Sequence, residues 1–150
     1  MDVKNRILQC AEDLSRKIGF RAVTMDQLSS QMGISKKTIY QFFTDKDELV
    51  DAIMETEISK RQQDCAVLHE EAENAIHEIF MTMEMLTEDF QDINPIVIHD
   101  LRKFHPATFD KFERHKNEFL YQVISKNLLR GKEEGLYRAE IDVDVLTRLR

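Results

Sequence analysis

The hydrophobic pattern of residues 24–49 is the most informative part of the chain. Its first apolar residues recur at intervals of three and four positions: Met25, Leu28 and Met32. This spacing predicts a short helix with one apolar face. Thr24 and Gln27 form a capping-box pattern at its start, and Gly33 stands where a helix C-terminus usually needs a left-handed residue. We therefore expect a helix that begins after Thr24 and ends in a turn at Gly33.

A second short helix is predicted directly after that turn. Ser35 can cap it, and Asp45 can cap the helix that follows. Within the second helix, Ile39 faces inward together with either Phe42 or Phe43. Its polar residues are then free to face outward: Lys36, Lys37, Thr38, Tyr40 and Gln41. Two helices joined by a glycine turn, with basic and hydroxyl groups opening the second, form the helix-turn-helix pattern. The second helix of that motif can enter a DNA major groove.

These residues resemble the DNA-binding segment of the TetR/AcrR family of bacterial transcriptional regulators. The matching order is a Thr that opens the first helix of the motif, Gly-Ile-Ser at the turn, Lys-x-Thr-Ile-Tyr, and Lys46 before Asp-Glu-Leu. The segment ILQCAEDLSRKIGFRAVT also fits that family's first helix and exit loop. Two positions depart from the family's pattern. Lys37 stands where Gly is common and adds charge, and Phe42 stands where His is common and removes a polar group.

The resemblance implies which residues contact DNA. The positions carried over are Thr24, Ser35, Lys36, Lys37, Thr38, Tyr40, Gln41 and Lys46. It also implies a pseudo-palindromic double-stranded DNA operator bound by a homodimer, and a repressor that a small-molecule ligand releases from that operator. Repression or activation depends on where the operator lies, which the sequence does not encode.

Apolar spacing predicts further helices on both sides of this segment. Their expected spans are residues 3–18, 46–65, 66–91, 95–104, 106 to between 131 and 135, and a last helix from about 142. Gly19 ends the first of them. Pro95, with Asn94 as its cap, and Pro106 stand at first-turn positions, where proline is favoured.

We therefore expect an all-α fold, with a three-helix helix-turn-helix head on a helical regulatory body. Four Gly, two Pro and no Trp agree with long uninterrupted helices. The predicted boundary separates a DNA-binding domain at residues 1–47 from a ligand-binding and dimerisation body at residues 48–150. The family's last two helices form a dimer interface, whereas this chain stops early in its last predicted helix. The body is therefore expected to be C-terminally incomplete.

The net charge of −7 is unevenly divided along the chain. Residues 1–46 hold eight Lys and Arg against five Asp and Glu, whereas the remainder holds thirteen against twenty-three. The head is therefore basic and the body acidic, and only the contacting face needs to attract phosphate. No apolar run is long enough to cross a membrane, and MDVKNR is not a signal peptide. We expect a cytoplasmic protein without a membrane partner.

The helices of the body are rich in large apolar side chains, which could line a pocket for an apolar small-molecule inducer. The candidates are Phe80, Met83, Phe90, Ile98, Leu101, Phe104, Phe112 and Phe119. Such stripes are more often ordinary core. The inducer is therefore an expectation that depends on a cavity between these helices.

Catalytic chemistry finds little support in the sequence. No histidine follows a Glu by three residues, as a di-metal helical bundle requires, and no nucleophile elbow or phosphate-binding glycine loop is present. His69, Glu73 and His77 recur every four residues, which favours a solvated helix edge over a metal site. We expect no enzyme activity, no cofactor and no metal. The alternative to a DNA-binding regulator is a helical protein-interaction module whose helix-turn-helix serves packing only.

Overall fold

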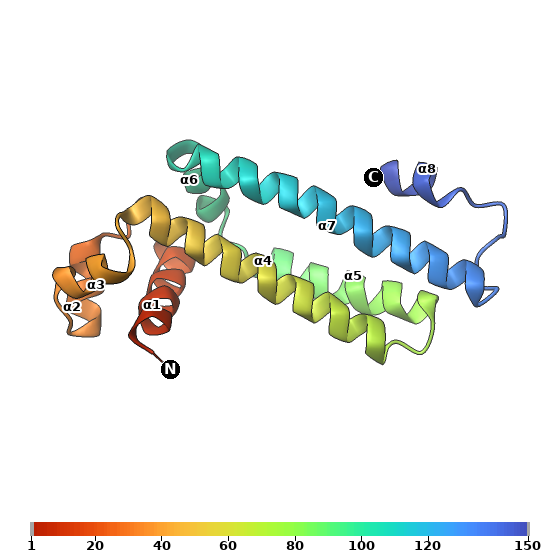
Figure 1. Cartoon of the computed structure of the whole chain (residues 1–150), viewed down its shortest axis with the longest axis horizontal. Helices are drawn as coiled ribbons and strands as arrows, with labels where there is room; N and C mark the ends of the chain where they lie inside the picture. The colour runs from red at the N-terminus through yellow and green to blue at the C-terminus, as the bar shows by residue number, and fades with distance from the viewer. Residues whose placement is uncertain (1, 150) are drawn as a thin grey trace. The chain divides into compact units, whose positions relative to one another are not determined.

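The computed structural model describes residues 2–149, except for the Phe90 side chain. Every regular element within these residues is an α-helix, which confirms the predicted all-α fold (Figure 1). The helices are α1 Val3–Ile18, α2 Met25–Met32, α3 Lys36–Phe42, α4 Lys46–Glu71, α5 Ala75–Asp92, α6 Pro95–Phe104, α7 Pro106–Glu133 and α8 Val143–Arg148.

Local polar side chains set the ends of the short helices, as their sequence predicts. The Thr24 hydroxyl accepts a hydrogen bond from the Gln27 N–H at 3.1 Å, and the Ser35 hydroxyl accepts one from the Thr38 N–H at 3.1 Å. Gly33 has φ 65°, the left-handed conformation that glycine adopts without a Cβ penalty. These caps satisfy backbone groups that a helix end leaves unpaired.

The predicted helix over residues 66–91 is wrong at its start. α4 continues to Glu71, and α5 begins only at Ala75. The Asn74 side chain accepts a hydrogen bond from the His77 N–H at 2.9 Å, which opens a new helix. The buried Ala72 and Ala75 continue the apolar spacing across this break. Apolar spacing alone therefore did not indicate the turn.

The chain forms two compact units. Met1–Glu57 and Ile93–Phe112 make up the first unit, and Ile58–Asp92 and Glu113–Arg150 make up the second. The helix α6 and the first turns of α7 thus pack with the helix-turn-helix segment. The predicted division at residue 47 groups residues 93–112 with the body instead, and as a division of function it stays a prediction.

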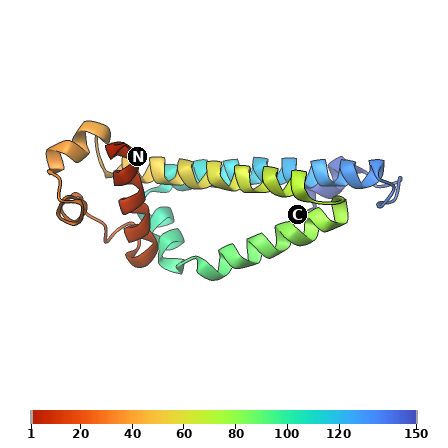
Figure 2. The same cartoon turned by 90° about the horizontal axis from the view of Figure 1, so that it is seen from below.

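The first unit has a continuous apolar core. Its buried members are Ile7, Ala11, Phe20, Val23, Leu28, Ile39, Phe43, Leu49, Val50, Ile53, Met54 and Leu101. Leu101 is the contribution of α6, which lies beside α1 (Figure 2). Each fully buried aliphatic side chain of this kind stabilises the fold by roughly 1.5–3 kcal/mol. The helix-turn-helix therefore rests on a core that includes a helix far away in the sequence.

The second unit buries small and polar residues. Ala72, Ala75, Glu78 and Asn127 are among its buried residues. Glu78 lies 2.9 Å from His69 Nδ1 and 3.1 Å from the Arg130 guanidinium, and the same guanidinium donates to the carbonyls of His69 and Ala72. Asn127 donates to the Ala75 carbonyl at 2.9 Å and accepts from the Tyr137 hydroxyl at 2.9 Å. Hydrogen bonds thus satisfy this buried polar interior.

Candidate nucleic-acid interface

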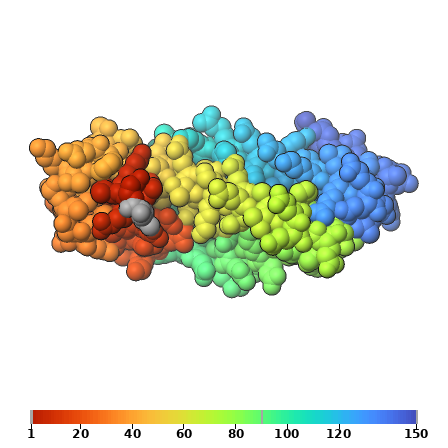
Figure 3. Space-filling model, turned by 60° about the horizontal axis from the view of Figure 1, so that its bottom comes forward, coloured from red at the N-terminus to blue at the C-terminus, as the bar shows by residue number. Residues whose placement is uncertain are grey.

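The helix α3 separates an apolar face from a polar one. Ile39 and Phe43 are buried in the core, which resolves the choice between Phe42 and Phe43, since Phe42 is 37% exposed. The opposite face presents exposed polar side chains: Lys36, Lys37, Tyr40 and Gln41. In the space-filling view, the orange atoms of α2 and α3 lie open at the surface (Figure 3). The apolar face thus holds α3 in place while the polar face remains available to a ligand.

Two of the predicted contact residues form a hydrogen bond to each other at the start of α3. The hydroxyls of Ser35 and Thr38 lie 2.9 Å apart, and the Ser35 hydroxyl also caps the helix. Ser35 is exposed, whereas Thr38 is half-buried. Thr24 is likewise exposed, with its hydroxyl used to cap α2. These three hydroxyls therefore fix the two helix starts, and each also lies at or near the surface.

Lys36 has a carboxylate partner that sequence reasoning missed. Its ammonium lies 2.8 Å from Asp26 in the first turn of α2. This hydrogen bond and the charge of Asp26 raise the pKa of Lys36. The pair joins the two helices of the motif across the solvent-exposed surface. No local signal identifies such a pair, because Asp26 also suits the first turn of any helix.

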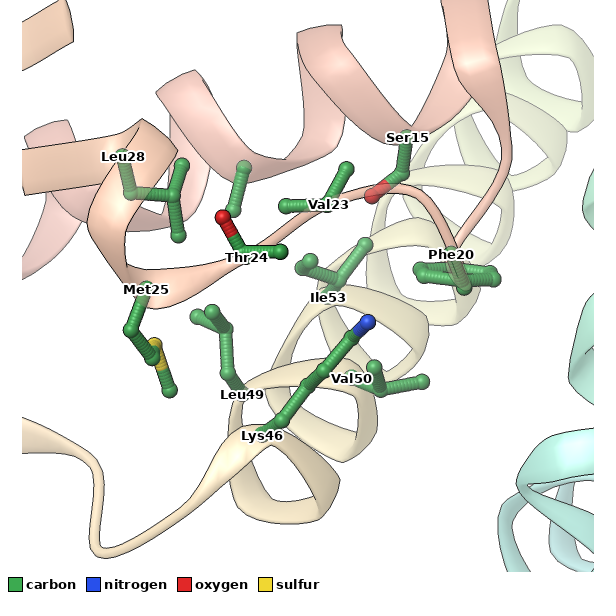
Figure 4. Close-up of a pocket in the computed structure, with 11 residues that line it drawn as sticks. Ser15, Phe20, Val23, Thr24, Met25, Leu28, Lys46, Leu49, Val50 and Ile53 are labelled. Atoms are coloured by element: carbon green, nitrogen blue, oxygen red, sulfur yellow. The ribbon is translucent and has the colours of Figure 1, made fainter. Parts of the chain in front are cut away.

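Lys46 is directed into the first unit. Its ammonium donates to the Arg21 carbonyl at 3.2 Å. Figure 4 shows its side chain beside Val50, among the residues that line a small pocket. Burial lowers the pKa of Lys46, and the carboxylates of Asp100 and Asp47 offset part of this effect. A contact between Lys46 and a phosphate therefore requires the ammonium to leave Arg21.

The space in that pocket is too small for an organic ligand. It amounts to about 10 Å³ and is lined by core residues of α1, α2 and α4 and of the connection between α1 and α2. This is about the space that one water molecule requires. The pocket belongs to the packing of the first unit.

The predicted ligand-pocket residues are divided between the two units. Ile98, Leu101, Phe104 and Phe112 lie in the first unit, and Phe80, Met83 and Phe119 lie in the second. The Phe90 side chain lies outside the described part of the structure. Leu101 is fully buried in the core, whereas Phe80 and Met83 on α5 are 69% and 57% exposed. The pocket itself stays a prediction.

The three residues considered for a metal do not share one helix. His69 lies in α4 and His77 in α5, whereas Glu73 lies in the turn between them. His69 pairs with Glu78, and His77 Nδ1 accepts from the Glu73 N–H at 3.1 Å. Among residues 2–149, no three His, Cys, Asp or Glu side chains are grouped as a metal site would require. Over the same residues, no helix combines the length and apolar character needed to cross a membrane.

The sequence of the helix-turn-helix region matches a known family. Residues 7–53 match the family described as bacterial regulatory proteins, tetR family. The chain is 29% identical over 101 residues to the uncharacterized HTH-type transcriptional regulator YvaF of Bacillus subtilis (strain 168). That match covers 67% of this chain and 53% of the relative. The chain thus spans about half the length of this curated relative.

Solved structures share the fold. The reduced form of Escherichia coli NemR matches with a TM-score of 0.80 at 15% identity, over 99% of this chain and 80% of that one. A putative transcriptional regulator from Saccharomonospora viridis in complex with choline matches with a TM-score of 0.76 at 19% identity, over 97% of this chain and 78% of that one. Thr24, the order Gly-Ile-Ser-Lys-x-Thr-Ile-Tyr over residues 33–40, the core that supports it and the match over residues 7–53 agree. The helix-turn-helix region of this chain, residues 7–53, is therefore similar to that of the tetR family of bacterial regulatory proteins.

Proposed function

We propose that the chain acts as a sequence-specific DNA-binding transcriptional regulator, in which α3 enters a major groove. The observation that carries this proposal is the polar, exposed face of α3 opposite the buried Ile39 and Phe43. A surface helix needs its buried face for stability, but packing alone does not require two lysines, a tyrosine and a glutamine on the other face. In this proposal residues 1–47 bind DNA and residues 48–150 form the regulatory body.

The chemistry of this face suits a duplex. Lys36 and Lys37 can neutralise phosphates, and this releases counterions and strengthens binding. Gln41 can form paired hydrogen bonds with an adenine edge in the major groove. Tyr40, which is 48% exposed, can contact a phosphate or a sugar through its hydroxyl. The basic balance of residues 1–46 supports the same partner.

We further propose that the working form is a homodimer. A helix as short as α3 reads only a few base pairs. Two heads related by a two-fold axis would bind half-sites about one helical turn apart, so the operator would be pseudo-palindromic. Such a regulator represses when its operator overlaps a promoter.

We also propose that an apolar small-molecule inducer binds the body. This proposal is supported by the exposure of Phe80 and Met83 on α5, because large apolar side chains in water favour an apolar partner. The putative transcriptional regulator from S. viridis, solved in complex with choline, has a similar fold. An inducer would weaken operator binding by about 5- to 150-fold if the two sites couple with 1–3 kcal/mol.

The test of DNA binding begins with a random duplex pool. The chain is used to select duplexes, and the affinity of the selected sequence is measured by mobility shift at several salt concentrations. We expect a recurrent pseudo-palindromic sequence and an affinity that falls steeply with salt. If no sequence is enriched and binding is absent even at low salt, the protein-interaction module becomes the better account.

Lys37→Ala tests whether α3 makes the contact. Loss of one phosphate contact should weaken binding and reduce the salt slope by about one. Lys17→Ala is the matched control, because it removes the same charge from the last turn of α1 in the same unit. Equal effects of the two variants would mean that general charge, and not α3, accounts for binding.

A further inference from the structure

A buried carboxylate of α6 holds the connection between α1 and α2. Asp100 is only 3% exposed, and its Oδ2 accepts a hydrogen bond from the Arg21 N–H at 3.0 Å. Its Oδ1 lies 3.2 Å from His99 Nδ1. Arg21 lies between α1 and α2, and 79 residues separate it from Asp100 in the sequence. The backbone that leads into the helix-turn-helix is therefore bonded to a helix outside the motif.

Gly19 shows how closely the two segments approach. It has φ +83°, and a Cβ added there would lie 2.4 Å from Asp100 Oδ2 and 3.2 Å from Ile96. Real Cβ atoms do not come within 3.0 Å of another heavy atom. A glycine at this position thus does more than end α1, because it leaves room for the carboxylate to reach the backbone.

Other side chains also bond to the backbone of Arg21 and to the end of α1. The Arg21 carbonyl accepts from Lys46 at the start of α4, and the Asn94 amide donates to the carbonyls of Arg16 and Lys17 at the end of α1. Burial opposes ionisation of Asp100, but the hydrogen bonds from Arg21 and His99 hold the pKa of this carboxyl below its ordinary value. The carboxylate is therefore an ionised acceptor for the Arg21 N–H.

We propose that Asp100 is a positioning residue for DNA recognition: its carboxylate fixes Arg21, and thereby the place at which α2 and the α3 face begin. Arg21 precedes the cap Thr24 by only three residues. A shift of this peptide therefore moves the start of α2, and with it α3, which packs on α2. This inference rests on the proposed function for its consequence, although the hydrogen bond can be tested without DNA.

Asp100→Ala removes the carboxylate, and Asp100→Asn keeps an oxygen that can accept from the Arg21 N–H. Nuclear magnetic resonance and hydrogen exchange of the Arg21 amide report on the bond directly. In Asp100→Ala we expect the Arg21 amide proton to move upfield and to exchange about tenfold faster or more, beyond any change in global stability. Asp100→Asn should recover most of that protection.

Leu101→Ala is the matched control, since Leu101 is the fully buried neighbour on α6 and belongs to the apolar core. It should lower stability while leaving the Arg21 signal near its wild-type position. On the selected duplex, Asp100→Ala should bind about tenfold more weakly, whereas Asp100→Asn should stay within about threefold at a temperature where both are folded.

The proposal is overturned if Asp100→Ala leaves the Arg21 amide unchanged, or if Leu101→Ala alters it equally. It is also overturned if Asp100→Ala frees the amide but binds the duplex as wild type does. If Asp100→Ala fails to fold, Gly19→Ala is used instead, and unchanged Arg21 protection there would overturn it. Should the wild-type chain select no duplex, the proposed function fails, and the Arg21 amide alone decides whether Asp100 positions the connection.

Discussion

The two units of the chain differ in how many large apolar side chains they bury. The first unit encloses large apolar residues such as Leu28, Ile39 and Phe43, all nearly inaccessible to solvent. In the second unit the buried side chains include Glu78 and Asn127, while Phe80 and Leu129 are more than half exposed. The first unit therefore combines a large apolar core with buried polar residues such as Asp100 and His105. The second buries few large apolar side chains, so hydrogen bonds form a larger share of its interior, and it leaves large apolar surface in water.

This difference agrees with the roles proposed for the two units. A DNA-reading helix must be held rigidly, and close apolar packing does this because the interior of a protein accommodates little change in volume. A regulatory body must respond to a partner, and exposed apolar side chains are groups that a partner can cover. The comparison thus predicts that truncation of an apolar side chain affects the two units very unequally.

The largest expected effect is that of Ile39→Ala in the first unit. Removal of this buried side chain leaves a cavity and should lower the free energy of unfolding by about 2–5 kcal/mol, as measured by denaturant titration. Phe80→Ala in the second unit removes a larger side chain that is 69% exposed, and it should change stability by no more than about 0.5 kcal/mol. Equal losses would contradict the contrast between the units.

The first unit was largely predictable from the sequence because its signals are local. Thr24, Gly33 and Ser35 act on backbone groups within a few residues, so their types alone indicate where helices begin and end. The outward face of α3 follows from the same helical period. The contacts made by Lys36 and Lys46 were not predictable, because their partners lie on other elements whose packing the sequence does not state.

The second unit was less predictable. The apolar stripe over residues 66–91 indicated helix, but Asn74 interrupts it at a position where the spacing itself continues. An Asn within a helical pattern is ambiguous between an exposed helix residue and a cap. The apolar stripe also did not indicate which part of the protein or which ligand packs against it. Met83 was expected to line a pocket, but it is 57% exposed. Periodicity identifies a face but not its partner.

A smaller effect is expected for Asn127→Ala in the second unit. This change removes the donor to the Ala75 carbonyl and the acceptor of the Tyr137 hydroxyl. These two groups then keep only the longer bond of 3.4 Å from the Tyr137 hydroxyl to the Ala75 carbonyl. We expect a loss of about 1–3 kcal/mol in the free energy of unfolding. Gln122→Ala, at an exposed position of the same helix, is the control and should be nearly neutral. If the two variants behave alike, hydrogen bonds do not stabilise the second unit as described.

The smallest expected effect concerns pH and the carboxylate of Glu134. The Ala75 N–H and the Arg130 guanidinium donate to it and lower the pKa of Glu134. A lowered pKa in the folded state stabilises the fold above the ordinary pKa of glutamate, and this stabilisation is lost as the pH falls through the folded-state value. Glu134→Gln should therefore lower the melting temperature slightly at neutral pH and much less at pH values below both pKa values. Glu133→Gln, which removes the same charge one residue earlier at an exposed position, should not show this difference. A Glu134→Gln effect that is independent of pH would mean that its carboxylate charge does not help to hold the start of α5.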